Sequence, residues 1–256
     1  MMADTFPLPA TPQQLADGLL RAYAAGQPGA GGTVPPRLRP GLPAGTAPRH
    51  RLPPPAPPLR SLHAVLDERR TVRDFAATPL PDAVLAAVLA AAREHDARTA
   101  PGETRAGNGL APLVVARRVA GLTPAVYGTG PDPACLYRYG PLTSPAWHCL
   151  FADPQIAGAP VLVVMAGSVA AACIRHGARG HLRLLRRAGS AVHAGWLAAL
   201  QRGYGGVILG ATLPSPELSA TARLDPVSRR PLAALALGTP GPDPLPHPAA
   251  PSSAGR

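Results

Sequence analysis

Proline is distributed very unevenly along this chain, and the distribution limits which part of the chain can fold. Its 35 prolines crowd between residues 28 and 58 and again after Pro240. Because proline lacks an amide hydrogen and has a fixed φ, such runs interrupt helices and sheets. About 180 residues lie between the two runs, a length typical of one domain. We predict an N-terminal helix and Pro-rich linker over 1–59, a globular domain over 60–239 and a disordered Pro-rich tail over 240–256, with no regular structure in the linker or the tail.

The periodicity of apolar residues predicts several elements within these limits. Thr11 is suited to cap a helix over residues 12–23, whose docking surface stays open: a partner, a second subunit or the main domain. Continuous apolar runs predict two strands that are covered on both faces. The expected strands are 112–116 and 160–165, and the expected helices are 61–66, 84–93, 182–201 and one that starts at Ser215. Composition alone does not separate an α+β sandwich from a doubly wound parallel fold.

Charge and cysteine content exclude several classes of protein. All 25 basic residues are arginine and the net charge is +11, but the arginines are spread along the chain and no recognition helix is visible, so nucleic acid binding is not expected. The cysteines are three in number and have no zinc-site spacing, so we expect reduced thiols and no metal site. Without a secretory signal or an apolar run of membrane-spanning length, the chain is expected to be soluble and cytoplasmic.

The run Asp67–Phe75 carries the clearest functional signal. It places Arg69, Arg70, Thr71 and Arg73 around one turn directly after a short helix. A guanidinium meets phosphate oxygens in pairs, and a hydroxyl adds a neutral donor, so this turn is suited to bind a phosphate monoester. A solvated basic surface is the alternative interpretation.

The order of motifs resembles that of the nitroreductase superfamily. The turn RRTVRDF, the Pro-containing turn after it and the Ala/Leu-rich helix over 84–93 are similar to the start of such proteins. Four further segments match in order: 160–167, 175–189, 203–210 and 231–238. The resemblance implies an α+β fold, with a mixed and mostly antiparallel sheet flanked by helices, and a homodimer that holds flavin mononucleotide (FMN) between its subunits.

The same resemblance assigns roles to particular residues. Arg69, Arg70, Thr71 and Arg73 would hold the FMN phosphate and the polar edge of the ring. Gly206 would allow the backbone to pass close to the flat ring, although a tight turn explains this glycine equally well. Asn108 would hydrogen-bond the ring edge, but Asn-Gly is also a strong turn signal.

Within the superfamily, the chain is most similar to dehydrogenases that oxidise azoline rings to azoles in ribosomal peptide natural products. The segment RHGARG resembles their KYGxRG motif, with Arg175-His176 in place of Lys-Tyr. Arginine stays protonated and cannot act as a base, whereas histidine can. His176 is therefore the expected base and Arg175 its neighbour in the site. His193, on the long helix over 182–201, is a weaker candidate because a histidine on a packed helix is usually structural.

Three functions remain open from the sequence. The first is an FMN-dependent oxidoreductase that tailors a peptide natural product, acting on a modified peptide or small molecule alongside biosynthetic partner enzymes. The second is an NAD(P)H-dependent reductase of nitro, quinone or activated alkene groups with the same flavin. The third is a flavin-free homologue that serves as a scaffold or partner subunit. The RRTVRDF turn favours the first two.

Overall fold

The computed structural model describes most of the central part of the chain. The described residues are 11, 13–14, 17–18, 20–21, 32–38, 49–130, 132–143, 147–148, 150–151, 153–210, 216–222, 224–225 and 227–241. All but the first two residues of the expected tail, and much of the expected helix over 12–23, lie outside them. The described positions within 13–21 are helical, and the Thr11 hydroxyl accepts a hydrogen bond from the Gln14 amide at 3.2 Å, as expected of a helix cap.

Seven strands in the described part of the chain form one sheet in the order β1-β4-β3-β2-β5-β7-β6. Every pairing between these strands is antiparallel. The expected α+β class with a mostly antiparallel sheet is therefore confirmed, and a doubly wound parallel fold is excluded. The strands are β1 (Arg49–Arg51), β2 (Ala111–Ala116), β3 (Ala125–Thr129), β4 (Cys135–Pro141), β5 (Val161–Gly167), β6 (Gly205–Leu209) and β7 (Arg230–Gly238).

One expectation about the linker was wrong. Arg49–Arg51 pairs with Cys135–Tyr137 at the edge of the sheet, and Leu52 beside it is buried. Residues 49–52 lie between Pro48 and Pro53 and contain no proline, so they keep the amides that an edge strand needs. Regular structure therefore starts before residue 60.

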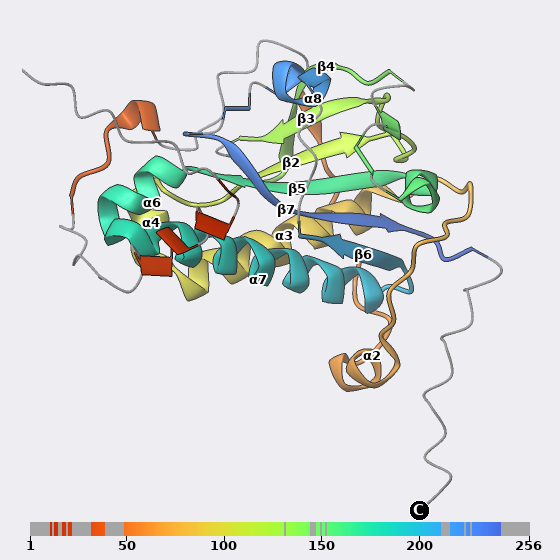
Figure 1. The fold of residues 1–256 in the computed structure, drawn as a ribbon. Coiled ribbons are helices and arrows are strands. Elements are labelled where there is room, and N and C mark those ends of the chain that lie inside the picture. Colours follow the sequence, from red (N-terminus) through yellow and green to blue (C-terminus); the bar gives the residue numbers. More distant parts are fainter. Residues whose placement is uncertain are drawn as a thin grey trace, which may run out of the picture.

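The two long helices, α3 (Asp82–Thr99) and α7 (Gly180–Leu200), pack against each other on one face of the sheet (Figure 1). The shorter helices have clear sequence signals: Ser61 and Ser168 each accept a hydrogen bond from the amide three residues on. Apart from the helix over 12–23, the expected helices are confirmed in place, and α3 extends further than its Ala/Leu-rich stretch. The shorter elements are α2 (Leu62–Glu68), α4 (Pro101–Arg105), α6 (Val169–His176), α8 (Pro216–Thr221), η1 (Pro36–Leu38), η2 (Pro154–Gly158) and η3 (Gly177–Arg179).

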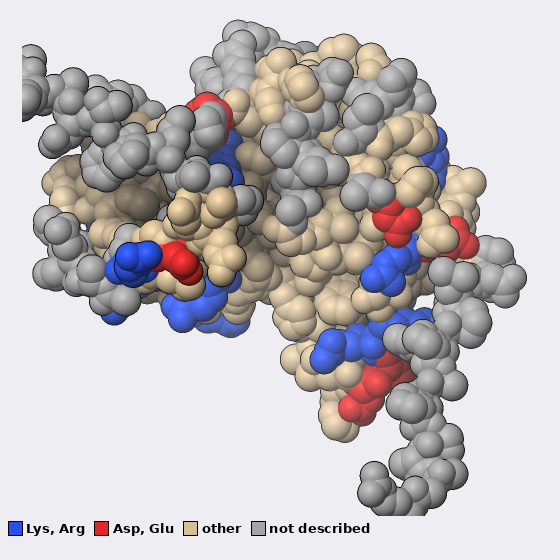
Figure 2. Space-filling view, in the orientation of Figure 1, with Lys and Arg blue, Asp and Glu red and all other residues tan. Residues whose placement is uncertain are grey.

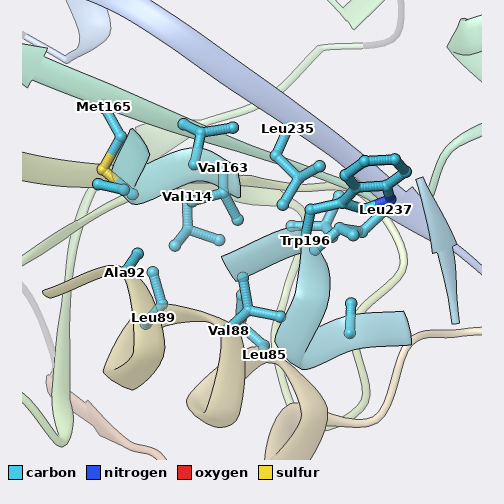
Figure 3. Close-up of a cluster of buried hydrophobic side chains, with 14 of the residues drawn as sticks. Leu85, Val88, Leu89, Ala92, Val114, Val163, Met165, Trp196, Leu235 and Leu237 are labelled. Atoms are coloured by element: carbon cyan, nitrogen blue, oxygen red, sulfur yellow. The ribbon is translucent and has the colours of Figure 1, made fainter. Parts of the chain in front are cut away.

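The core has one layer on each face of the sheet. Between the sheet and the helix pair α3–α7, side chains from both helices interlock with those of β2, β5 and β7 (Figure 3). On the other face, Trp147, Phe151 and Ile156 cover the sheet. Because β2 and β5 are buried on both sides, their sequences are continuous apolar runs, as expected. This packing fixes the positions of α3 and α7, including their outer surfaces and their ends, relative to the sheet.

Candidate functional site

The turn after α2 is anchored so that its polar side chains face outward. Val72 and Phe75 are buried in the second core layer, and the residues between and before them are exposed. A parallel bridge joins Thr71 to Gly206 at the start of β6, and the Val72 amide donates a hydrogen bond to the Gly206 carbonyl at 3.0 Å. The structure thus brings the basic turn next to Gly206. Sequence motifs had suggested the two separately, and Thr71 and Gly206 are 135 residues apart in the chain.

The arginines of this turn are available to a ligand. The acids just before them are engaged elsewhere: Asp67 pairs with His63 at 3.6 Å, and Glu68 pairs with Arg60. Within the described part of the chain, no hydrogen bond or ion pair engages the side chains of Arg69, Arg70 and Arg73. Figure 2 shows arginine side chains gathered around α2 beside acidic ones. The turn therefore carries free cationic donors at the surface.

Two residues of α7 complete this area. Trp196 is buried, and its indole Nε1 has no hydrogen-bond partner. Its ring lies against Gly206, 3.3 Å from where a β-carbon would stand. His193 contacts Trp196 edge-on, and burial, followed by the charges of Arg69 and His95, lowers the pKa of His193. His193 thus lies near the basic turn, and we group Arg69, Arg70, Thr71, Arg73, His193, Trp196 and Gly206 as the basic-turn cluster.

The lack of a side chain at Gly206 has an internal cause. A β-carbon there would stand 2.6 Å from the Ala236 carbonyl oxygen and 2.9 Å from Leu237. Packing against β7 therefore requires glycine at this position, so its absence of a side chain does not by itself indicate a ligand. Gly210, at the far end of β6, differs, because nothing lies within 4 Å of its β-carbon position.

The other expected residues gather around Glu103, which the sequence analysis did not identify. Its Oε1 accepts hydrogen bonds from Arg175 Nε at 2.7 Å and His176 Nε2 at 3.0 Å, and Asn108 Nδ2 donates to its Oε2 at 2.7 Å. Burial raises the pKa of Glu103, but these hydrogen bonds together lower it further than burial raises it. We call Glu103, Asn108, Arg175 and His176 the carboxylate cluster.

The hydrogen bonds of His176 define its tautomer. Arg183 Nη1 lies 3.0 Å from His176 Nδ1, and a guanidinium can only donate, so Nδ1 is the acceptor in the neutral ring. Nε2 then carries the hydrogen that Glu103 accepts. His176 and Arg183 both line a cavity of about 370 Å³. Because the Arg183 side chain is exposed, it can leave Nδ1 and open that nitrogen to the cavity.

A second buried ion pair braces the same loop. Arg187 donates to both oxygens of Asp96 at 2.9 Å, and also to the Asn108 carbonyl oxygen at 3.2 Å. Asp96 further accepts from the Leu110 amide at 3.0 Å. Asn108 is consequently held as a buried loop residue whose side-chain amide faces Glu103, and its Oδ1 has no partner.

The expected site residues therefore form two clusters in a single chain. The basic-turn cluster lies toward the carboxyl end of α7, beside α2 and β6, and the carboxylate cluster lies at its amino end, beside α4 and α6 (Figure 1). A helix of 21 residues is about 30 Å long. One small ligand cannot reach both clusters within one chain.

The described residues contain neither a cluster of metal ligands nor a membrane-spanning helix. No group of three or more histidine, cysteine, aspartate or glutamate side chains is arranged there to hold a metal ion. Among the helices of that part of the chain, none has both the length and the apolar character required to cross a bilayer.

Comparison with known proteins adds a family. The sequence profile described as the nitroreductase family matches residues 66–239. No curated protein sequence matches this chain.

Solved structures share the fold at low sequence identity. A structure described as a nitroreductase from Anabaena variabilis superposes with a TM-score of 0.63 at 16% identity, covering 76% of this chain and 42% of that one. Another, from Ralstonia eutropha, gives 0.59 at 21% identity over 84% of this chain and 98% of that one. A chain of the Escherichia coli microcin synthetase McbBCD complex with truncated pro-MccB17 gives 0.53 at 16% identity, over 69% of this chain and 73% of that one. This chain thus spans less than half the length of the first of these proteins.

Proposed function

The chain belongs to the nitroreductase family, and from that premise we propose that it is an FMN-dependent oxidoreductase that dehydrogenates azoline rings in a modified peptide. The observation that carries the proposal is the basic-turn cluster. Its three arginines have no partners and lie in the turn that is bridged to β6. The buried indole N–H of Trp196, which also lacks a partner, lies in the same cluster.

This donor set fits the polar half of FMN. The phosphate carries close to two negative charges, and each charge-assisted hydrogen bond contributes about 1.5–3 kcal/mol. Arg69, Arg70, Thr71 and Arg73 are the residues that would hold it. The unpaired Trp196 Nε1 adds a donor on the side chain that lies against Gly206. When bound, FMN supplies a two-electron acceptor for hydride, which protein side chains cannot provide.

In this proposal the carboxylate cluster supplies the base. His176 would accept the substrate's C–H proton at Nδ1, once Arg183 has moved away. Glu103 fixes the ring through Nε2 and stabilises the imidazolium that results. Arg175, held by the same carboxylate oxygen, is a cation that orients substrate and cannot take a proton.

A dimer would bring the two clusters together. With two copies of α7 crossing in opposite directions, the basic-turn cluster of one subunit would face the carboxylate cluster of the other. The outer surface of α7 supports this arrangement: Leu182 and Leu185 are 47% and 37% exposed, and Gly189 has nothing within 4 Å of its β-carbon position. An exposed apolar stripe of this kind is typical of an interaction surface.

The choice of a peptide substrate rests on two similarities. The segment RHGARG resembles the motif of azoline dehydrogenases, and one structure that shares the fold is part of a microcin synthetase complex that holds a truncated precursor, pro-MccB17. Azoline oxidation suits a site with a base and a flavin, because it removes a proton and a hydride from adjacent atoms of the ring.

The visible absorption spectrum of the purified protein tests this function first. We expect the absorption bands of an oxidised flavin, which lie at about 370 and 450 nm. Incubation with an azoline peptide should then bleach these bands without oxygen and yield a product lighter by two hydrogens. A protein that stays colourless after mixing with FMN would support a scaffold role, whereas bleaching only by NAD(P)H would support a reductase.

A further inference from the structure

A large cavity borders the loop that carries Asn108, but no residue of either cluster lines it. It has a volume of about 940 Å³ and lies between the carboxyl half of α3, the loop over 107–110 with the start of β2, and the end of β3. Much of its wall consists of small residues, among them Ala90, Ala97, Gly109 and Gly130, which leave the space open. Its size falls in the range of sites that enclose a small organic molecule.

One cation in the wall has no partner. Arg93 is half-buried, and its Nη1 is shielded from solvent without a hydrogen-bond partner. No ion pair or hydrogen bond to Arg93 occurs within the part of the chain described above. Burial lowers the pKa of this guanidinium, which nevertheless stays protonated at neutral pH. A desolvated charge in this position is costly unless an anion meets it.

The acids nearby do not meet that need. Asp96 accepts hydrogen bonds from Nε and Nη2 of Arg187, and Glu94 is exposed at the rim of the cavity. Asp132 raises the pKa of Arg93 from a distance, but its carboxylate is exposed and lies 3.6 Å from Arg51. Arg93 therefore remains the cation available to a ligand inside the cavity.

We propose that this cavity binds an amphipathic carboxylate, with the apolar group between α3 and the loop over 107–110 and the carboxylate against Arg93. The chemistry is that of an apolar tail with one anionic end, which both a free organic acid and the carboxyl terminus of an apolar peptide possess. The proposal does not depend on flavin binding, because Arg93 belongs to neither the basic-turn cluster nor the carboxylate cluster.

Isothermal titration calorimetry on the full chain tests the proposal. Decanoate should bind at least about tenfold more tightly than decanol, a ratio that corresponds to about 1.4 kcal/mol. N-acetyl-Ala-Leu-Phe with a free carboxyl terminus, compared with its amide, distinguishes the two sources of carboxylate. Preference for the free peptide over decanoate identifies a peptide ligand, and the reverse identifies a free acid.

Three variants localise the binding. Arg93→Gln should lose about tenfold or more in decanoate affinity and leave decanol unaffected, whereas Arg98→Gln, on the same helix but outside the cavity wall, should match the parent chain. Ala90→Phe, at an exposed wall position, should abolish binding of both. Thermal melts verify that each variant is folded. Equal affinity for decanoate and decanol, no binding by the parent chain, or unchanged binding in Arg93→Gln or Ala90→Phe would overturn the proposal.

Discussion

Arg73 is exposed and unpaired, so its replacement perturbs little besides a bound ligand. Arg73→Ala should weaken FMN binding by about 1.5–3 kcal/mol, the contribution of one charge-assisted hydrogen bond. Fluorescence titration of the apoprotein with FMN measures the change. Arg98→Ala removes an equally exposed arginine from α3 and serves as the control. Equal losses in both variants would mean that overall charge, and not this turn, attracts the flavin.

His176 carries the proposed chemistry, and its replacement should separate catalysis from cofactor binding. His176→Ala should reduce turnover of an azoline peptide by about 10²–10⁴, the usual effect of removing a general base, with the flavin spectrum retained. Arg175→Ala should instead raise the substrate concentration required, since it removes a positioning charge. Steady-state kinetics with Arg98→Ala as the control provide the comparison. Unchanged turnover in His176→Ala would rule out the base and favour the reductase.

Glu103 links the carboxylate cluster to pH. Because its pKa is lowered in the folded chain, its ionisation stabilises the fold above the unfolded pKa of about 4.3, and this contribution disappears as pH falls through the folded value. Glu103→Gln should therefore cost about 1–3 kcal/mol at pH 7 and progressively less on acidification. Urea unfolding across pH, with the exposed Glu94→Gln as the control, checks this. A loss independent of pH would indicate packing and not charge.

At the scale of elements, the junction of α6 and α7 depends on one glycine. A β-carbon at Gly180 would stand 2.1 Å from the Ala172 carbonyl oxygen, so the two helices cross at backbone contact. Gly180→Ala should destabilise the fold by about 1–3 kcal/mol or more, because backbone must shift. Gly102→Ala in α4 meets nothing within 4 Å and should be neutral or stabilising by up to about 1 kcal/mol. Thermal unfolding of both variants gives the comparison.

The same junction positions Arg175 and His176. Both residues form the last turn of α6, and Gly180 brings the start of α7, with Arg183 and Arg187, close to them. A shift at Gly180 would therefore also disturb the hydrogen bonds to Glu103.

For the whole molecule, we predict a homodimer through α7 with twice the 26.1 kDa mass of the chain. The double variant Leu182→Glu, Leu185→Glu adds charge to the exposed stripe and should give a monomer that also loses flavin. Size-exclusion chromatography with light scattering measures the mass. Val227→Glu, at a position 50% exposed on the loop before β7, is the control. A monomer of the parent chain that retains flavin would exclude a site shared between subunits.

Local sequence signals determined much of the fold. The Ala/Leu-rich part of α3 and the apolar runs of β2 and β5 show patterns that depend on neighbours in sequence or on burial on both faces, so periodicity was sufficient to predict them. The helix α6, which Ser168 caps, was not predicted. The sequence also indicated the basic turn through its crowded arginines, and the structure adds that buried Val72 and Phe75 hold its polar residues outward.

Tertiary structure alone decided how the site residues are grouped. Glu103 meets Arg175 and His176 across more than 70 residues of sequence, and Trp196 meets Gly206 only because α7 lies over β6 and β7. The edge strand over 49–51 likewise requires β4 to pair with it. Such contacts follow from the packing of distant elements, which no local pattern encodes. For the same reason, the division of the expected site into two clusters at opposite ends of one helix became visible only in the folded chain.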